Sequence, residues 1–99
     1  MAKLISIYWR DIPAQVVGRA GRTNVKKELA PRFANAIDRA AMRAGRGSSD
    51  AYLADWRRAE PAPCGDDLAA EADRAAAEIE RAYDSGRLKA LIANGGRTP

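Results

Sequence analysis

Apolar and polar residues alternate near the N-terminus, a pattern typical of a half-buried β-strand. Between residues 3 and 10 one face carries Ile5, Ile7 and Trp9, and the other carries Leu4, Ser6, Tyr8 and Arg10. The turn-forming residues 11–13 follow, and residues 14–19 offer a second strand, which ends where Gly18 and Gly21 relax the backbone. The pattern therefore predicts a β-hairpin.

Between residues 24 and 44 the apolar period lengthens to about 3.6 residues, which is typical of an amphipathic helix. The apolar stripe consists of Val25, Leu29, Phe33, Ile37, Ala40, Ala41 and Ala44. Pro31 removes one backbone donor and would clash with a preceding helical turn. We therefore expect a short helix at about 24–29, a main helix from about residue 31, and a loop at 45–50.

The second half of the chain predicts one strand and two helices. Residues 51–58 alternate again and predict a third strand, which prolines at positions 61 and 63 end. Aspartates at positions 66 and 67 suit a helix N-terminus, and an alanine-rich apolar stripe extends this second helix to about residue 85. Residues 87–93 predict a short C-terminal helix.

Together these elements predict an α+β fold in the order β-β-α-β-α plus a short C-terminal helix. We expect a three-stranded antiparallel sheet in the spatial order 2-1-3, with the two main helices packed on one face. Residues 1–93 are expected to form a single α+β domain and residues 94–99 a frayed C-terminal tail. The large side chains expected in the core are Ile5, Ile7, Trp9, Leu29, Phe33, Ile37, Trp56, Leu68, Ile79 and Leu91.

The composition of the 99-residue chain excludes several kinds of reaction centre. With one cysteine and no histidine, the chain has no internal disulfide, no imidazole metal ligand and no Cys-His or Ser-His-Asp centre. No stretch of the sequence is apolar enough for a signal sequence or a membrane span. We therefore expect a cytoplasmic protein with no membrane association, no cofactor, no metal ion and no enzymatic activity.

Positive charge is concentrated in the first part of the chain. Residues 1–60 hold twelve Lys and Arg against six Asp and Glu, whereas residues 61–99 hold five against seven. Thirteen of the seventeen cations are arginines, whose planar guanidinium groups suit recognition of carboxylates, phosphates and aromatic rings. The residues expected to contact a partner are Tyr8, Arg10, Asp11, Arg19, Arg22, Lys26 and Arg57.

The hairpin residues admit two interpretations. In the first, Tyr8, Arg10 and Asp11 form a recognition edge beside a polar, basic sheet face. In the second, Trp9 fills the core, while Arg10 and Asp11 pair and shape the turn. The residues expected on the polar face are Ser6, Tyr8, Arg10, Gln15, Arg19, Asp55 and Arg57.

Cys64 is a candidate reactive thiol. It lies between Pro63 and Gly65, just before a predicted helix start, where a thiol pKa can be lowered. The neighbouring Asp66 and Asp67 oppose thiolate formation, and the chain has no second cysteine to resolve an oxidised form. An incidental loop thiol is therefore the favoured interpretation.

Several ordered motifs resemble a known bacterial family. They are residues 8–16 (YWRDIPAQV), 27–29 (KEL), 32–33 (RF), 36–42 (AIDRAAM) and 50–53 (DAYL), with Trp56. Over roughly residues 3–93 the chain is similar to the small domain of the "virulence factor" family, which also occurs in the larger conserved virulence factor C proteins. The resemblance implies no catalytic residues. It implies partners among enzymes of one-carbon and corrinoid metabolism, and it raises iron–sulfur handling as a further role.

The leading hypothesis is a non-catalytic protein-interaction module, an accessory subunit or adaptor for a larger cytoplasmic protein. The alternative is a nucleic-acid-binding regulator that uses the basic sheet face, where Tyr8 alone supplies a stacking ring. A further alternative is a redox or iron–sulfur accessory protein that acts through Cys64, with a second chain completing the ligand set.

Overall fold

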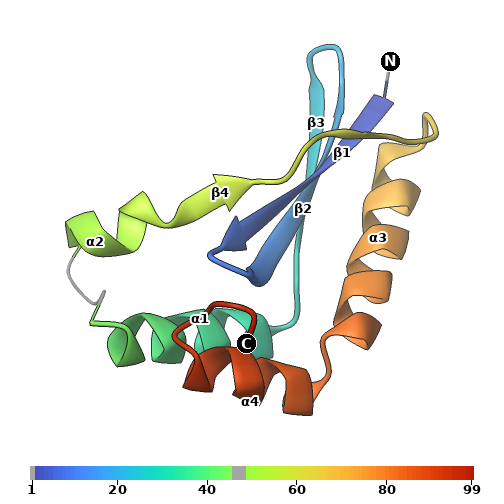
Figure 1. The fold of residues 1–99 in the computed structure, drawn as a ribbon. Helices are drawn as coiled ribbons and strands as arrows, with labels where there is room; N and C mark the ends of the chain where they lie inside the picture. The colour runs from blue at the N-terminus through green and yellow to red at the C-terminus, as the bar shows by residue number, and fades with distance from the viewer. Residues whose placement is uncertain (1, 46–48) are drawn as a thin grey trace.

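The N-terminal hairpin forms as predicted, and a third strand extends it (Figure 1). The computed structural model describes residues 2–45 and 49–99. Strand β1 (Ala2–Trp9) pairs antiparallel with β2 (Ile12–Ala20), which pairs antiparallel with β3 (Thr23–Glu28).

The short helix predicted at residues 24–29 is wrong, because residues 24–28 belong to β3 and Leu29 follows it. Gly21, at a φ of +58°, makes the tight turn that returns the chain beside β2. Pro31 also prevents the following helix from extending backwards. A four-residue apolar spacing is compatible with alternation, so Val25 and Leu29 fit a strand as well as a helix.

Two further strands lie on the other side of β1. β4 (Trp56–Arg58) pairs antiparallel with the end of β1, and β5 (Ala62–Pro63) with its beginning. The hydrogen-bonded order is β3-β2-β1-β4, with β5 paired to β1 off this path. The predicted order 2-1-3 is present as β2-β1-β4, but the sheet has five strands instead of three. The strand predicted at 51–58 is shortened because α2 (Ser49–Ala54) precedes it.

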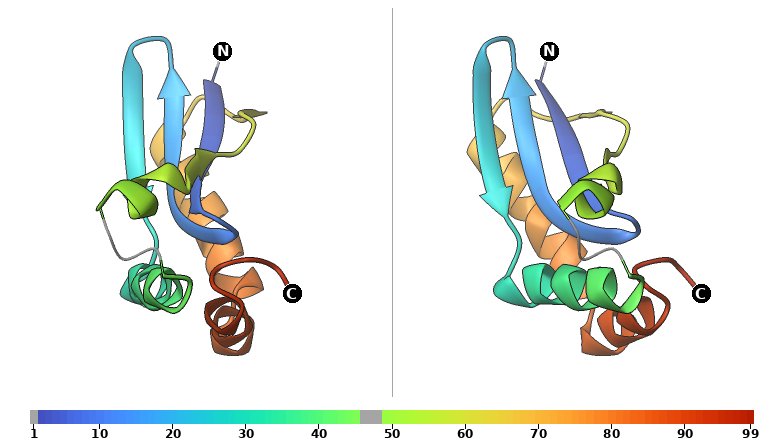
Figure 2. Two further views of the ribbon diagram at one scale, coloured as in Figure 1. Left: turned by 60° about the vertical axis from the view of Figure 1, so that its left-hand side comes forward. Right: turned by 90° about the vertical axis from the view of Figure 1, so that its left-hand side faces the viewer.

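Three longer helices accompany the sheet in the described part of the chain. α1 (Pro31–Arg43) begins at a proline, whose missing N–H is harmless in a first turn. α3 (Leu68–Ala82) and α4 (Ser85–Ala93) are capped by the preceding aspartates, whose carboxylates accept backbone N–H groups. α3 runs along one face of the sheet, whereas α1 and α4 lie side by side near the β1–β2 turn (Figure 1 and Figure 2). Of the two main helices, only α3 thus follows the length of a sheet face.

In the middle of the hairpin, the face of β1 that packs against a helix is the opposite of the predicted one. The pattern predicted that the face with Ile5 and Ile7 would meet the helices. A Cβ on Gly18 would lie 3.3 Å from the Leu68 Cβ of α3, so Gly18 faces that helix. Leu4 pairs with Gly18, so the even-numbered β1 residues, including Ser6, face α3 and the odd-numbered ones face away. Gln15 pairs with an odd-numbered residue. Ser6 and Gln15 therefore lie on opposite faces, and the predicted polar face is not one surface.

A β-bulge redirects the end of the hairpin. The register of the β1–β2 ladder shifts between Ile7 and Tyr8, and a bulge bends its strand and strengthens the local twist. Beyond it, Trp9 and Ile12 have no exposed surface, whereas Ile7 is partly exposed. A bulge has no characteristic sequence of apolar and polar residues. Strict alternation therefore did not predict this shift in register.

The core lies between the sheet, α3 and the α1–α4 pair. Seven of the ten predicted core side chains are buried, namely Ile5, Trp9, Leu29, Phe33, Ile37, Leu68 and Leu91. The other three, Ile7, Trp56 and Ile79, are partly exposed. Ile12, Val16 and Leu88 are also buried, although the sequence pattern assigned Ile12 to a turn.

The C-terminal segment, expected to be a frayed tail, contacts the β1–β2 turn. The backbone N–H of Asp11 donates to Gly96 O at 2.8 Å, and that of Thr98 donates to the Asp11 carboxylate at 2.6 Å. Gly96 has a φ of +91°, and a Cβ there would lie 2.7 Å from the Trp9 ring. Glycine is therefore required at position 96 by both its backbone conformation and its packing.

Gly96→Ala is expected to lower the free energy of unfolding by about 1–3 kcal/mol, because overpacking against Trp9 adds to the strain of a positive φ. Urea unfolding followed by tryptophan fluorescence measures the change. Gly86→Ala is the matched control, since a Cβ on Gly86 would meet the Asp84 carboxylate at an ordinary 3.5 Å. Equal stability of the two variants would contradict the packing at Gly96.

Candidate functional site

Arg10, at the β1–β2 turn, is held by contacts within the chain. Its φ is +53°, a conformation that few non-glycine residues adopt. Its Nε donates to Asp55 Oδ2 at 3.1 Å and its Nη1 donates to Gly95 O at 2.9 Å. Only 14% of its side chain is exposed, and the guanidinium lies 5.1 Å from the centre of the Trp9 ring. Arg10 thus joins the turn to the start of β4 and to the C-terminal segment.

Tyr8, Asp11 and Arg57 gather around the same turn. The Arg57 guanidinium lies 4.6 Å from the centre of the Tyr8 ring, and its Nε donates to Arg10 O at 2.8 Å. Arg57 Nη2 lies 3.3 Å from Asp11 Oδ1. Burial raises the pKa of Tyr8, and the hydrogen bond from the Thr98 N–H lowers the pKa of Asp11. The structure therefore brings four predicted contact residues into one turn cluster (Tyr8, Arg10, Asp11 and Arg57), where they bind one another and nearby backbone.

The other three predicted contact residues lie at the β2–β3 end of the sheet. Arg19 Nε donates to Asn24 Oδ1 at 3.1 Å, and Lys26 Nζ lies 3.6 Å from the Glu28 carboxylate. Arg22 is exposed in the turn between the strands. β3 forms an edge of the sheet, and lysines on an edge strand oppose pairing with another chain. The basic residues here therefore also have an architectural explanation.

Cys64 lies between β5 and α3 and is partly exposed. Burial, and then the Glu71 carboxylate, raise the pKa of its thiol, which opposes the thiolate form that reactivity requires. The Glu71 carboxylate accepts hydrogen bonds from Gly65 N and Arg74 Nη2, both at 2.9 Å. Within residues 2–45 and 49–99, no group of three or more His, Cys, Asp or Glu residues could hold a metal ion.

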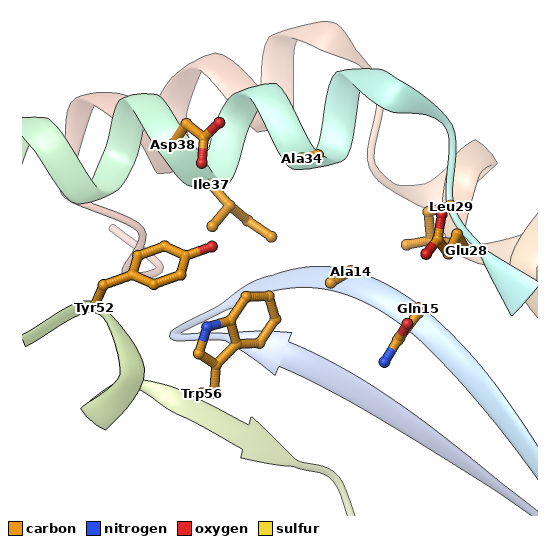
Figure 3. A pocket seen from close by; sticks show the side chains of 9 residues that line it. All are labelled: Ala14, Gln15, Glu28, Leu29, Ala34, Ile37, Asp38, Tyr52 and Trp56. Atoms are coloured by element: carbon orange, nitrogen blue, oxygen red, sulfur yellow. The ribbon is translucent and has the colours of Figure 1, made fainter. Parts of the chain in front are cut away.

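A cleft that the sequence pattern did not reveal lies between α1, β2 and the α2–β4 segment (Figure 3). Its volume is about 260 Å³. The residues that line this aromatic cleft are Ala14, Gln15, Glu28, Leu29, Ala34, Ile37, Asp38, Tyr52 and Trp56. The rings of Tyr52 and Trp56 lie 5.7 Å apart at an interplanar angle of 83°. Burial, and then the Asp38 carboxylate, raise the pKa of Tyr52, which keeps its hydroxyl neutral near pH 7.

An exposed methionine adjoins the aromatic cleft, and a leucine of α2 is also exposed. Met42 is 78% exposed and Leu53 is 64% exposed. Met42 and Tyr52 line one neighbouring hollow, and Leu53 follows Tyr52 in α2. A second hollow, which shares two residues with the cleft, is lined by Ile7, Gln15, Trp56, Arg57 and Arg58. The cleft therefore continues into further concave surface on both sides.

The sequence signal for this cleft was the four-residue spacing of Tyr52 and Trp56. That spacing places two residues on one face of a strand or of a helix. We assigned both residues to a strand, whereas Tyr52 lies in α2 and Trp56 begins β4. Their pairing with α1 across the cleft depends on tertiary packing, which the local pattern does not contain.

Arg10→Ala is expected to lower the melting temperature, with a loss of about 1–3 kcal/mol in the free energy of unfolding, because it leaves partly buried hydrogen-bonding groups unsatisfied. Thermal unfolding followed by circular dichroism measures the change. Arg22→Ala, at the exposed β2–β3 turn, should change the stability by no more than about 0.5 kcal/mol. An unchanged melting temperature for Arg10→Ala would argue against a structural role.

The contact between Thr98 and Asp11 is expected to be lost in acid. The folded-state pKa of Asp11 is lowered, so its carboxylate stabilises the fold above the unfolded-state pKa, and this contribution disappears as the pH falls through the folded-state pKa. The NMR resonance of the Thr98 amide should titrate with a midpoint below the ordinary aspartate value of about 3.9. Asp11→Asn should remove this titration. A midpoint at or above the ordinary value would count against the contact.

Comparison with known proteins identifies a family for this chain. No helix in the described residues is long and apolar enough to cross a membrane. No curated protein and no solved structure matches the chain. The family described as "Virulence factor" matches residues 7–92, a range that contains both the turn cluster and the aromatic cleft. The match confirms the resemblance expected from the motifs, and the chain belongs to the virulence factor family.

Proposed function

We propose that this protein is a non-catalytic protein-interaction module, an accessory subunit or adaptor that docks on a larger cytoplasmic protein. The observation that carries the proposal is the aromatic cleft, with Met42 exposed in the hollow beside it. Aromatic residues and methionine are enriched at protein interfaces, and a few buried anchors supply most of the binding energy. A single exposed apolar side chain is ordinary. An exposed methionine beside a cleft with two aromatic walls indicates a binding surface.

The buried core supports the walls of the cleft. Trp9 Nε1 donates to Tyr52 O at 2.8 Å, and the two rings stack at 5.9 Å. Trp9, which has no exposed surface, therefore holds one wall of the cleft in place. A binding surface that is already ordered loses less conformational entropy when a partner docks.

The nucleic-acid alternative has weaker support from the geometry. Lys26 lies 3.6 Å from Glu28, and Lys27 lies 3.6 Å from Asp73, so acidic neighbours reduce the positive potential of this end of the sheet. The ring of Tyr8, expected to stack on a base, is instead covered by the Arg57 guanidinium. Proteins that bind single strands use exposed rings along a basic groove.

Met42→Asp is expected to weaken partner binding about tenfold or more, because it places a charge beside an apolar binding surface. The tagged protein captures proteins from a nuclease-treated cell lysate, and a protein held by the wild type should be absent with this variant. Arg22→Asp is the matched control, since it introduces the same side chain at the exposed β2–β3 turn. The control should retain the partner.

The capture experiment separates the proposed function from its alternative. Melting temperatures of both variants within the error of the wild type establish that each variant is folded. Retention of every captured protein by Met42→Asp would contradict docking at the aromatic cleft. Loss of all captured proteins on nuclease treatment, together with loss by Arg22→Asp, would favour nucleic-acid binding.

A further inference from the structure

We propose that the aromatic cleft takes a cationic side chain, an arginine or a lysine, presented by the partner protein. This inference rests on the proposed function, because it names the group that the docking surface recognises. Its basis is the presence in one cleft of two aromatic rings at a steep angle, two carboxylates and an apolar floor.

The aromatic walls attract positive charge. The Tyr52 and Trp56 rings are 5.7 Å apart and inclined by 83°. Figure 3 shows the hydroxyl end of Tyr52 and the ring of Trp56 both directed into the cleft. The face of an aromatic ring carries partial negative charge, so a guanidinium or ammonium group within about 6 Å of the ring centre is attracted to it. Trp9 stacks on one face of Tyr52, so Trp56 would supply the ring contact with a cation, while Tyr52 presents its hydroxyl oxygen.

The charged side chains that line the cleft are negative, which suits the binding of a cation. The whole chain has a net charge of +4. In the described part of the chain, however, the charged residues that line the cleft are both acidic, namely Glu28 and Asp38. Figure 3 shows Asp38 extending from α1 on the side of the Tyr52 hydroxyl. A cationic group beside Asp38 would gain charge-assisted hydrogen bonds as well as contact with the aromatic wall.

The cations nearest the cleft have contacts of their own. Lys26 Nζ lies 3.6 Å from the Glu28 carboxylate and offsets part of its negative charge. Asp38 therefore attracts an incoming cation more strongly than Glu28 does. In the adjoining hollow, Arg57 contacts Tyr8 and Asp11 of the turn cluster. The remaining cation of that hollow is the exposed Arg58, whose charge opposes a cation that approaches through the hollow.

The floor of the cleft suits the aliphatic part of arginine or lysine. Leu29 and Ile37 line the cleft and are 8% and 2% exposed. Arginine and lysine pack their methylene groups on apolar surface while the charged group stays beside polar atoms. An acidic or phosphorylated segment would instead bring like charges against Glu28 and Asp38, which disfavours docking.

An NMR titration with N-acetyl-arginine amide tests this inference on the intact protein. The indole N–H of Trp56 and the ring protons of Tyr52 are expected to shift. N-acetyl-citrulline amide has nearly the same shape without the charge and should bind about tenfold more weakly. Asp38→Asn should weaken binding of the arginine probe about tenfold. Asp66→Asn, in the exposed loop before α3, is the matched control and should leave the binding unchanged.

The outcomes distinguish this inference from the proposed function. Equal binding of the arginine and citrulline probes, or unchanged binding by Asp38→Asn, would overturn the cationic anchor. In the capture experiment, a partner lost by Met42→Asp but fully retained by Asp38→Asn would also overturn it, while the docking function would stand. Loss of the partner by both variants, with retention by Asp66→Asn, supports both.

Discussion

The burial of Trp9 is the constraint on which the rest of the structure depends. A buried indole N–H requires an acceptor, and Tyr52 O supplies it at 2.8 Å. Gly96 packs so closely on the other side of the ring that a Cβ would lie 2.7 Å away. One side chain at the end of β1 therefore brings together α2 and the C-terminal segment, which are far apart in the sequence.

The turn next to Trp9 strengthens this junction. Arg10 binds Asp55 and Gly95, and the Asp11 carboxylate accepts from Thr98 N. Arginine and aspartate beside an aromatic ring have the chemistry of a recognition edge, but here their polar atoms bind within the chain. A positive φ at Arg10 is maintained only where the surrounding contacts determine the backbone. These contacts shape the turn, but Arg10 pairs with Asp55 and Asp11 with Arg57, whereas the second interpretation expected Arg10 and Asp11 to pair with each other.

The same junction makes the aromatic cleft. Because Trp9 holds Tyr52, α2 stands opposite α1, and the space between them is walled by Tyr52, Trp56 and Ile37. The surface that best suits a partner is thus a product of how the core packs. Of the residues expected to contact a partner, Tyr8, Arg10, Asp11 and Arg57 adjoin this region, whereas Arg19, Arg22 and Lys26 lie at the far end of the sheet. Sequence charge alone did not distinguish the two groups, because it carries no information about which cations have acidic neighbours.

The sequence by itself determined the family, the α+β class, the hairpin, the helix that begins at Pro31 and most of the buried side chains. These features follow from local causes: apolar periodicity, capping aspartates and proline chemistry act over a few residues. Only the tertiary structure decided the strand at 23–28, the bulge before Tyr8, the face of β1 that α3 covers, and the position of Tyr52. Each of these depends on contacts between residues distant in the chain, and a pattern with a period of two or about 3.6 residues does not record such contacts.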